Sequence, residues 1–255
     1  MNSRTRLKRI VVLFSTIILI LAGSSVCYSA TESIMDTARK YYYGDRAPRN
    51  INKAFKLYLK AAQNGNVEAM FIVGGMYKQG YGTPINEGES FKWLYAAALS
   101  GHSSKESERI LGQSFISGTS VPQNYEEAIH WYELAAKGGD PEAQSELAFL
   151  YFSGDHVAQD YEKAKYWFNI AARKGYAIAQ YNMGIIWYTG NGVDAVDTKK
   201  AYAWFNLSAA NGYGSGTAAK NFLETILSDE ELRIAQRYSI ELYRDIKRIK
   251  RKTVL

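Results

Sequence analysis

Large hydrophobic residues, small residues and glycines recur along this chain with a period of 36 to 38 residues. The anchors of the pattern are Leu57, Trp93, Trp131, Trp167 and Trp204. Alanine or serine occupies the positions four and five residues after each anchor. Glycine occupies the position eight residues after it, at Gly65, Gly101, Gly139, Gly175 and Gly212. A fixed period of this length predicts a repeat architecture, in which each repeat is one supersecondary motif that packs against the next.

Each period predicts two helices. The first extends from one glycine to the next, as in PEAQSELAFLYFSG, and the second begins at an asparagine or aspartate, as in NYEEAIHWYELAAKGG. The side chain of that residue can accept hydrogen bonds from the unpaired amides of the first helical turn. Asn86 with Glu89, and Asn124 with Glu127, have the spacing of a capping box. We expect the alanine pairs to let the helices approach closely and the aromatic residues to fill the remaining space.

The order of these residues, visible in GYAIAQYNMGIIWYTGNGV followed by DTKKAYAWFNLSAANG, resembles the Sel1-like repeat, a relative of the tetratricopeptide repeat. The resemblance covers most of residues 31–227. It implies an all-α fold, a right-handed α-α solenoid of about five helix-pair repeats. The predicted repeats are 31–64, 65–100, 101–138, 139–174 and 175–211.

Residues 212–255 are predicted to form a degenerate half repeat and a basic C-terminal capping helix. Ser228 with Glu231 provides a helix start, and apolar residues from Leu232 to Ile249 fall at helical spacings. The run KRIKRK at 247–252 has two interpretations. Its cations can interact with the helix dipole at a solvated C-terminus, or they can contact a membrane or another anionic surface.

Residues 1–30 have the order of a secretory signal peptide. The basic segment MNSRTRLKR precedes the uncharged run IVVLFSTIILILAGSSV and a stretch of small residues. The strongly apolar part, residues 10–22, is shorter than the roughly 18 residues of a spanning helix. We therefore expect an exported protein, periplasmic or secreted, with an uncut anchor in the inner membrane as the alternative. Cleavage near residue 30 would remove Cys27, the single cysteine, so no disulfide would form.

The net charge of +6 is concentrated at the two ends of the chain. The first nine residues carry +4 and residues 241–255 carry another +4, which leaves −2 for residues 10–240. Because the body of the chain is nearly neutral, charge does not favour nucleic acid as a partner.

His130 and Glu133, with Asp140 and Glu142 close behind, resemble a metal or acid-base site. The repeat argues against it, because the positions matching His130 hold Lys56, Lys92, Tyr166 and Ala203. The chain also lacks a nucleophile elbow and a phosphate-binding loop. We therefore expect no enzyme, no cofactor and no metal site. Exported relatives that act on β-lactams resemble a cysteine-rich branch of the family, and this chain lacks those cysteines.

The sequence thus favours a non-enzymatic scaffold or adaptor that binds another protein on the concave face of the solenoid, lined by the first helix of each repeat. The resemblance implies service in envelope assembly, signalling or host interaction, and the oligomeric state stays open. The alternatives are an envelope hydrolase and a membrane-anchored organiser that uses the basic tail. The candidate contact residues are Gln144, Ser145, Phe149, Phe152, Gln180, Tyr181, Ile185 and Tyr188. The competing interpretation is that the polar candidates are simply exposed to solvent and that the aromatic ones pack between repeats.

Overall fold

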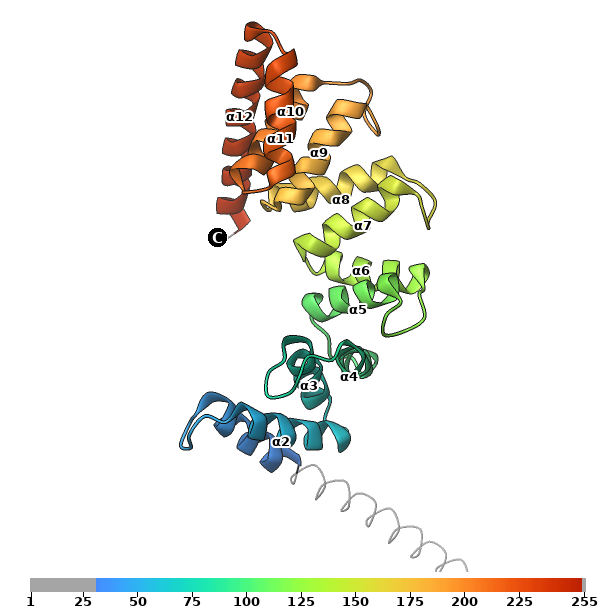
Figure 1. The fold of residues 1–255 in the computed structure, drawn as a ribbon, viewed down its shortest axis with the longest axis vertical. Helices are drawn as coiled ribbons and strands as arrows, with labels where there is room; N and C mark the ends of the chain where they lie inside the picture. Colours follow the sequence, from blue (N-terminus) through green and yellow to red (C-terminus); the bar gives the residue numbers. More distant parts are fainter. Residues whose placement is uncertain (1–30, 254–255) are drawn as a thin grey trace, which may run out of the picture. The chain divides into compact units, whose positions relative to one another are not determined.

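The computed structural model describes residues 31–253 as helices joined by short loops, and that range contains no strand (Figure 1). The chain divides into two compact units, Met1–Ser103 and Ser104–Leu255. The predicted all-α fold of helix pairs is confirmed. The predicted signal peptide, residues 1–30, lies outside the described residues. None of the helices in residues 31–253 is long and apolar enough to cross a membrane.

Unit 1 contains two helix pairs. A helix over residues 31–43 is followed by α2 (Ile51–Gln63), and α3 (Val67–Gln79) is followed by α4 (Glu87–Leu99). Met35, Tyr58 and Val73 belong to one buried cluster, so the first pair and α3 share a hydrophobic core.

Unit 2 continues the alternation of first and second helices and adds a final long helix. Each first helix packs against the second helix that follows it. The helices are α5 (Lys105–Ser117), α6 (Tyr125–Lys137), α7 (Pro141–Ser153), α8 (Tyr161–Arg173), α9 (Ala177–Thr189), α10 (Thr198–Ala210), α11 (Gly214–Ile226) and α12 (Asp229–Thr253).

The helix starts predicted from asparagine and aspartate are confirmed. The side chain of each accepts a hydrogen bond from an amide in the first turn of its helix. These residues are Asn50, Asn86, Asn124, Asp160 and Asp197. At the other end, the first helices α3, α5, α7 and α9 end on glycines with φ between 65° and 82°, the left-handed conformation that glycine adopts without strain.

The capping-box prediction at Asn86 and Asn124 was only half right. The backbone N–H of Asn86 donates to the carbonyl of Tyr77 on the preceding helix, so it is not available to Glu89. The Glu89 carboxylate instead accepts a hydrogen bond from the indole Nε1 of Trp93 at 3.0 Å. In the next repeat, Glu127 accepts from Trp131 at 3.2 Å in the same way. The glutamate three residues after the cap therefore orients the anchor tryptophan.

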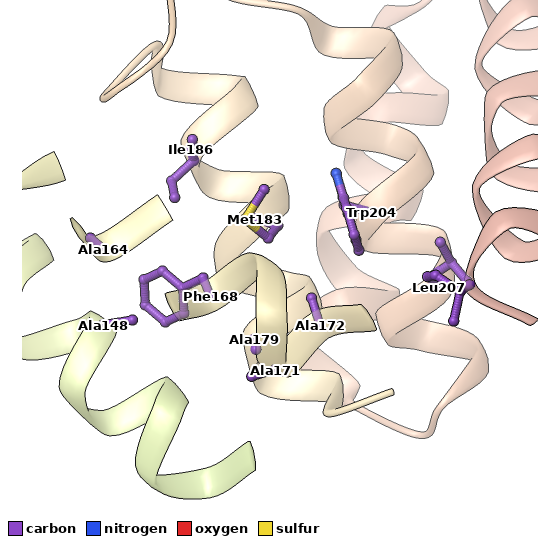
Figure 2. Close-up of a cluster of buried hydrophobic side chains, with 11 residues drawn as sticks. Ala148, Ala164, Phe168, Ala171, Ala172, Ala179, Met183, Ile186, Trp204 and Leu207 are labelled. Carbon is purple, nitrogen blue, oxygen red and sulfur yellow. The ribbon is translucent and has the colours of Figure 1, made fainter. Parts of the chain in front are cut away.

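The large residue that joins the two helices of a repeat is the one directly after the anchor position. Tyr132 and Phe168 are 1% exposed, whereas Trp93 and Trp167 are only half-buried. Aromatic residues therefore fill the space as predicted, and among the anchors Trp131 and Trp204 are also buried, at 6% and 5% exposed. Figure 2 shows Phe168 of α8 in the cluster that also contains Ala148 of α7.

A small residue on the first helix makes room for this large side chain. A Cβ atom added at Gly74 of α3 would lie 2.6 Å from Cγ of Leu94 on α4, and one added at Gly112 of α5 would lie 2.8 Å from Cδ1 of Tyr132 on α6. At Gly184 of α9 it would collide with the ring of Phe205. The two helices of these repeats therefore approach as closely as the absence of a side chain allows.

The C-terminal helix α12 packs along α10. Ala235 and Ile246 are buried, and Leu242 packs against the cluster of Figure 2, which confirms the predicted amphipathic capping helix. Its start is a reciprocal cap, because Ser228 N–H donates to Glu231 Oε2 at 3.0 Å and Glu231 N–H donates to Ser228 Oγ at 3.4 Å.

Two adjacent glycines in α3 provide a test of the close approach. Gly74→Ala is expected to destabilise the chain by about 1–3 kcal/mol, because the new methyl group overpacks against Leu94. Gly75→Ala meets no atom within 4 Å and is expected to stabilise the chain by up to about 1 kcal/mol through helix propensity. Denaturant unfolding of both variants measures the difference, and equal effects at the two positions would contradict the close approach of the helices at Gly74.

Candidate partner-binding face

Three first helices of unit 2, α7, α9 and α11, carry a hydrophobic residue at the same position, the ninth of the helix. Phe149 of α7 is 52% exposed and Phe222 of α11 is 51% exposed, while Ile185 of α9 is half-buried. Tyr188 and Ile226 are also exposed. The ring of Tyr188 contacts that of Phe222 edge-on with centroids 6.4 Å apart, and α9 contacts α11. We call these five residues the apolar strip.

A charged group, which we call the polar cluster, lies at the start of α7 and on α5. Arg109 Nη1 of α5 forms an ion pair with Glu142 Oε1 at 3.2 Å, and Arg109 Nε lies 3.6 Å from Asp140 Oδ1. The side chain of Asp140 is 8% exposed, and it also accepts a hydrogen bond from the Ala143 amide at 2.8 Å. With Glu146 one turn further along α7, the polar cluster has three carboxylates and one guanidinium.

The carboxylates of the polar cluster affect the pKa of one another and of Tyr176, the residue before α9. The Glu146 side chain is exposed at the surface, but the protein atoms around it desolvate its carboxylate and raise its pKa. Glu142 raises this pKa further, and Arg109 opposes both effects. Burial raises the pKa of Tyr176, and the carboxylates of Glu142 and Glu146 add to that increase. A cationic group of a partner would relieve this excess of negative charge.

Three of the eight predicted contact residues are buried, and the prediction is wrong for them. Gln144, Ser145 and Gln180 are 2%, 3% and 1% exposed, so no partner can contact their side chains in this structure. Gln144 Nε2 donates to the carbonyl of Ala136 at 2.8 Å, and Gln180 Nε2 donates to that of Ala172 at 3.0 Å. Both glutamines therefore connect a first helix to the end of the second helix before it.

The hydrophobic candidates divide into two groups. Phe152 packs edge-on against Tyr161 and Phe168 of α8, and Tyr181 lies 5.4 Å from the rings of both Phe205 and Tyr213, so these two residues contribute to packing. Ile185 also packs against the buried cluster around Phe205 and Leu223 and is only partly accessible. Phe149 and Tyr188 are exposed, and the role of the apolar strip in binding stays a prediction.

Sequence reasoning missed four residues of this face: Phe222, Ile226, Arg109 and Glu146. The signal for Phe222 was present, because it is the ninth residue of its helix, as Phe149 and Ile185 are of theirs. It was overlooked because the tract that contains α11 keeps little of the repeat pattern. Nothing in the period indicates Arg109 and Glu146, since both residue types change from one repeat to the next.

The residues that resembled a metal or acid-base site are engaged elsewhere. Glu133 forms an ion pair with Lys137 at 2.8 Å, while Asp140 and Glu142 face Arg109. His130 lies edge-on to Trp131. In the part of the chain that the structure describes, no three histidine, cysteine, aspartate or glutamate side chains are grouped to hold a metal ion.

Comparison with protein families gives one match. The family model described as the Sel1 repeat matches five consecutive segments, which together make up more than half of the chain. The segments are residues 32–66, 67–102, 106–140, 141–176 and 177–213.

Solved structures give the same result. A Sel1 repeat protein from Oxalobacter formigenes is 30% identical with a TM-score of 0.60, and the alignment covers 84% of this chain and 88% of that one. A protective antigen of uropathogenic Escherichia coli strains with an SLR fold is 24% identical with a TM-score of 0.54, over 83% of this chain and 53% of that one. At this lower identity the likeness supports the fold alone.

Two curated relatives match part of the chain. An uncharacterized protein of Neisseria meningitidis serogroup B is 32% identical over 104 residues, which are 41% of this chain and 21% of that protein. An exopolysaccharide production negative regulator of Rhizobium meliloti is 29% identical over 127 residues, 45% of this chain and 47% of that protein. The chain therefore spans less than half the length of either relative.

Replacing Glu146 tests the electrostatics of the polar cluster. Because its pKa is raised in the folded chain, ionisation of this carboxyl disfavours the folded state, and the effect develops as pH rises from the ordinary glutamate pKa through the raised one. Glu146→Gln is therefore expected to increase the free energy of unfolding at pH 7, with the gain disappearing in acid. Denaturant unfolding over a pH series measures it.

The control for this prediction is Glu241→Gln, which removes an exposed carboxylate from α12. It is expected to change stability little at any pH. A lower stability of Glu146→Gln at pH 7, or a difference that does not depend on pH, would show that the polar cluster does not hold this carboxyl in an unfavourable charged state.

Proposed function

The chain belongs to the Sel1 repeat family, and from this premise we propose that it is a scaffold that binds a partner protein on the apolar strip and polar cluster of unit 2. Sel1 repeat proteins are generally protein-interaction scaffolds, and their fold is typically non-catalytic. The single observation that carries the proposal is the exposure of a large hydrophobic residue at the same position of α7 and α11.

This exposure is not required by the packing of the repeats. The ninth position of α3 is Gly75 and that of α5 is Gln113, so the helix pair forms without a hydrophobic residue there. Exposed hydrophobic residues that gather on one face, with a polar rim, are typical of interaction sites. Aromatic side chains in such sites contribute a large share of the binding energy when a partner buries them.

The charge of the polar cluster supports a more specific partner. Its three carboxylates exceed its one guanidinium, and Glu146 has no ion pair among the described residues. We therefore propose that the partner presents apolar side chains to the strip and a lysine or arginine to Glu146. Opposite charges in this arrangement set the register of the partner and increase its association rate.

We also propose that the protein is exported and that it acts in the cell envelope or outside the cell. This proposal rests on the order of basic, apolar and small residues in residues 1–30. The mass of the N-terminal peptide from fractionated cells tests it. A peptide that begins near residue 30 supports export with cleavage, and a peptide that retains residues 10–26 contradicts cleavage and supports the membrane-anchored alternative.

A photo-crosslinking amino acid at position 149 tests the binding face in the native cell. Position 149 is expected to capture a specific protein, while position 240 on α12, where Ile240 is 53% exposed, serves as a control of equal exposure. With the purified partner, Phe149→Ala and Phe222→Ala are each expected to weaken binding about tenfold or more, or about 1.4 kcal/mol.

Both variants are expected to keep the stability of the parent chain, because the substituted rings are half exposed. Ile240→Ala is expected to bind as the parent does. Equal capture at positions 149 and 240, or an unchanged affinity of both phenylalanine variants for the captured protein, would rule out this face.

A further inference from the structure

A second surface of unit 2 lies among the second helices and α12. It is a cleft of about 580 Å³, lined by α8, α9, α10 and α12. Met183 and Trp204 line it together with Leu242 of α12, so it has an apolar floor. Arg173 of α8 and Glu241 of α12 line it as well. Pockets of this size hold small molecules or short segments of chain.

Trp204 is 5% exposed, yet its indole N–H has no acceptor among the described residues. In the second and third repeats, the residue four positions before the tryptophan is a glutamate that accepts this hydrogen bond. In the fifth repeat that position is Lys200, which lies 4.2 Å from the ring centre of Trp187 and 3.4 Å from Asp197 Oδ2. Figure 2 shows the Trp204 nitrogen turned away from Ala172.

The indole nitrogen itself remains accessible to solvent, although the rest of the Trp204 side chain is almost wholly buried. Because Trp204 lines the cleft, a ligand there can offer this N–H a carbonyl or carboxylate oxygen in place of water.

The guanidinium group of Arg173 can also pair with a ligand in the cleft. Its Nε donates to Asn169 Oδ1 at 3.1 Å, and it has no carboxylate within ion-pair distance in the described part of the chain. Lys165, which also lines the cleft, differs, because Glu162 and the carbonyl of Gly192 occupy its ammonium group. Arg173 can therefore bind a carboxylate of a ligand through two parallel hydrogen bonds.

The opposite wall limits which anions fit. Three carboxylates line the cleft, and Glu162 and Asp245 are paired with Lys165 and Arg248. Glu241 has no ion pair among residues 31–248, whose side chains the structure describes. A multiply charged anion such as phosphate would be repelled by this carboxylate, whereas a ligand with one carboxylate and neutral amide groups would be repelled less. The apolar floor adds a requirement for a hydrophobic group next to that carboxylate.

We propose that this cleft binds a short peptide segment in which an apolar residue adjoins a glutamate or aspartate. The acidic side chain pairs with Arg173, a backbone carbonyl accepts the Trp204 N–H, and the apolar side chain lies on Met183 and Leu242. The cleft uses other residues and the opposite charge preference from the apolar strip and polar cluster, so it does not depend on the function proposed above.

The test uses the full chain and an acetylated, amidated pentapeptide, Gly-Leu-Glu-Leu-Gly. The readout is the indole N–H resonance of Trp204 in a ¹H–¹⁵N spectrum, identified by its loss in Trp204→Phe. This resonance is expected to shift with the peptide, and the analogue with glutamine in place of glutamate is expected to bind at least fivefold more weakly. Arg173→Gln is expected to abolish the preference for the glutamate peptide.

Arg237→Gln removes an exposed cation of α12 that does not line the cleft, and it is expected to retain both affinity and preference. Thermal unfolding shows whether each variant is folded. The proposal is overturned if the Trp204 resonance does not respond to the peptide, if the parent chain binds the glutamate and glutamine peptides equally, or if acetate or inorganic phosphate shifts the resonance as much as the peptide does.

Discussion

The close contact between a small residue on the first helix of a repeat and a large residue on the second is the interaction on which the rest of the structure depends. Where the small residue is glycine, as at Gly112 against Tyr132, a single added methyl group would collide with the ring. In another repeat the small residue is an alanine, because Ala148 of α7 lies in the same buried cluster as Phe168 of α8. This contact sets the spacing of the helix pair, and the caps and closing glycines set where its helices begin and end, which leaves the other positions free to vary.

The variable positions then serve two purposes. Some join successive repeats, as the amides of Gln144 and Gln180 do when they donate to the last carbonyls of the preceding second helix. Others face solvent, and there the side chains follow no packing rule. The apolar strip and the cleft beside Trp204 both arise in this way. In the cleft, Lys200 stands at the position where the second and third repeats have a glutamate that accepts the indole N–H.

The sequence predicted the helix pairs, their asparagine and aspartate caps and their closing glycines, because each depends on local backbone chemistry that recurs in phase. It did not show that Tyr132, the residue after Trp131, is the one that packs on Gly112, since both residues are buried and only tertiary packing decides which of them meets the facing helix. The sequence also could not predict the burial of Gln144. Its hydrogen-bond partner is a backbone carbonyl, and every residue has one, so no residue type marks the contact. Phe222 was within reach and was hidden only by the weak pattern of its tract.

A double-mutant cycle between Gly112 and Tyr132 tests most directly whether the contact between the two helices holds each repeat together. Gly112→Ala overpacks the contact and Tyr132→Ala leaves a cavity at the same place, so each variant alone is expected to destabilise unit 2. In the double variant the added methyl group occupies part of that cavity. The double variant is therefore expected to be more stable than the sum of the two losses implies, by about 1 kcal/mol or more in free energy of unfolding. Losses that add to within about 0.3 kcal/mol would contradict the dependence of the repeat on this contact.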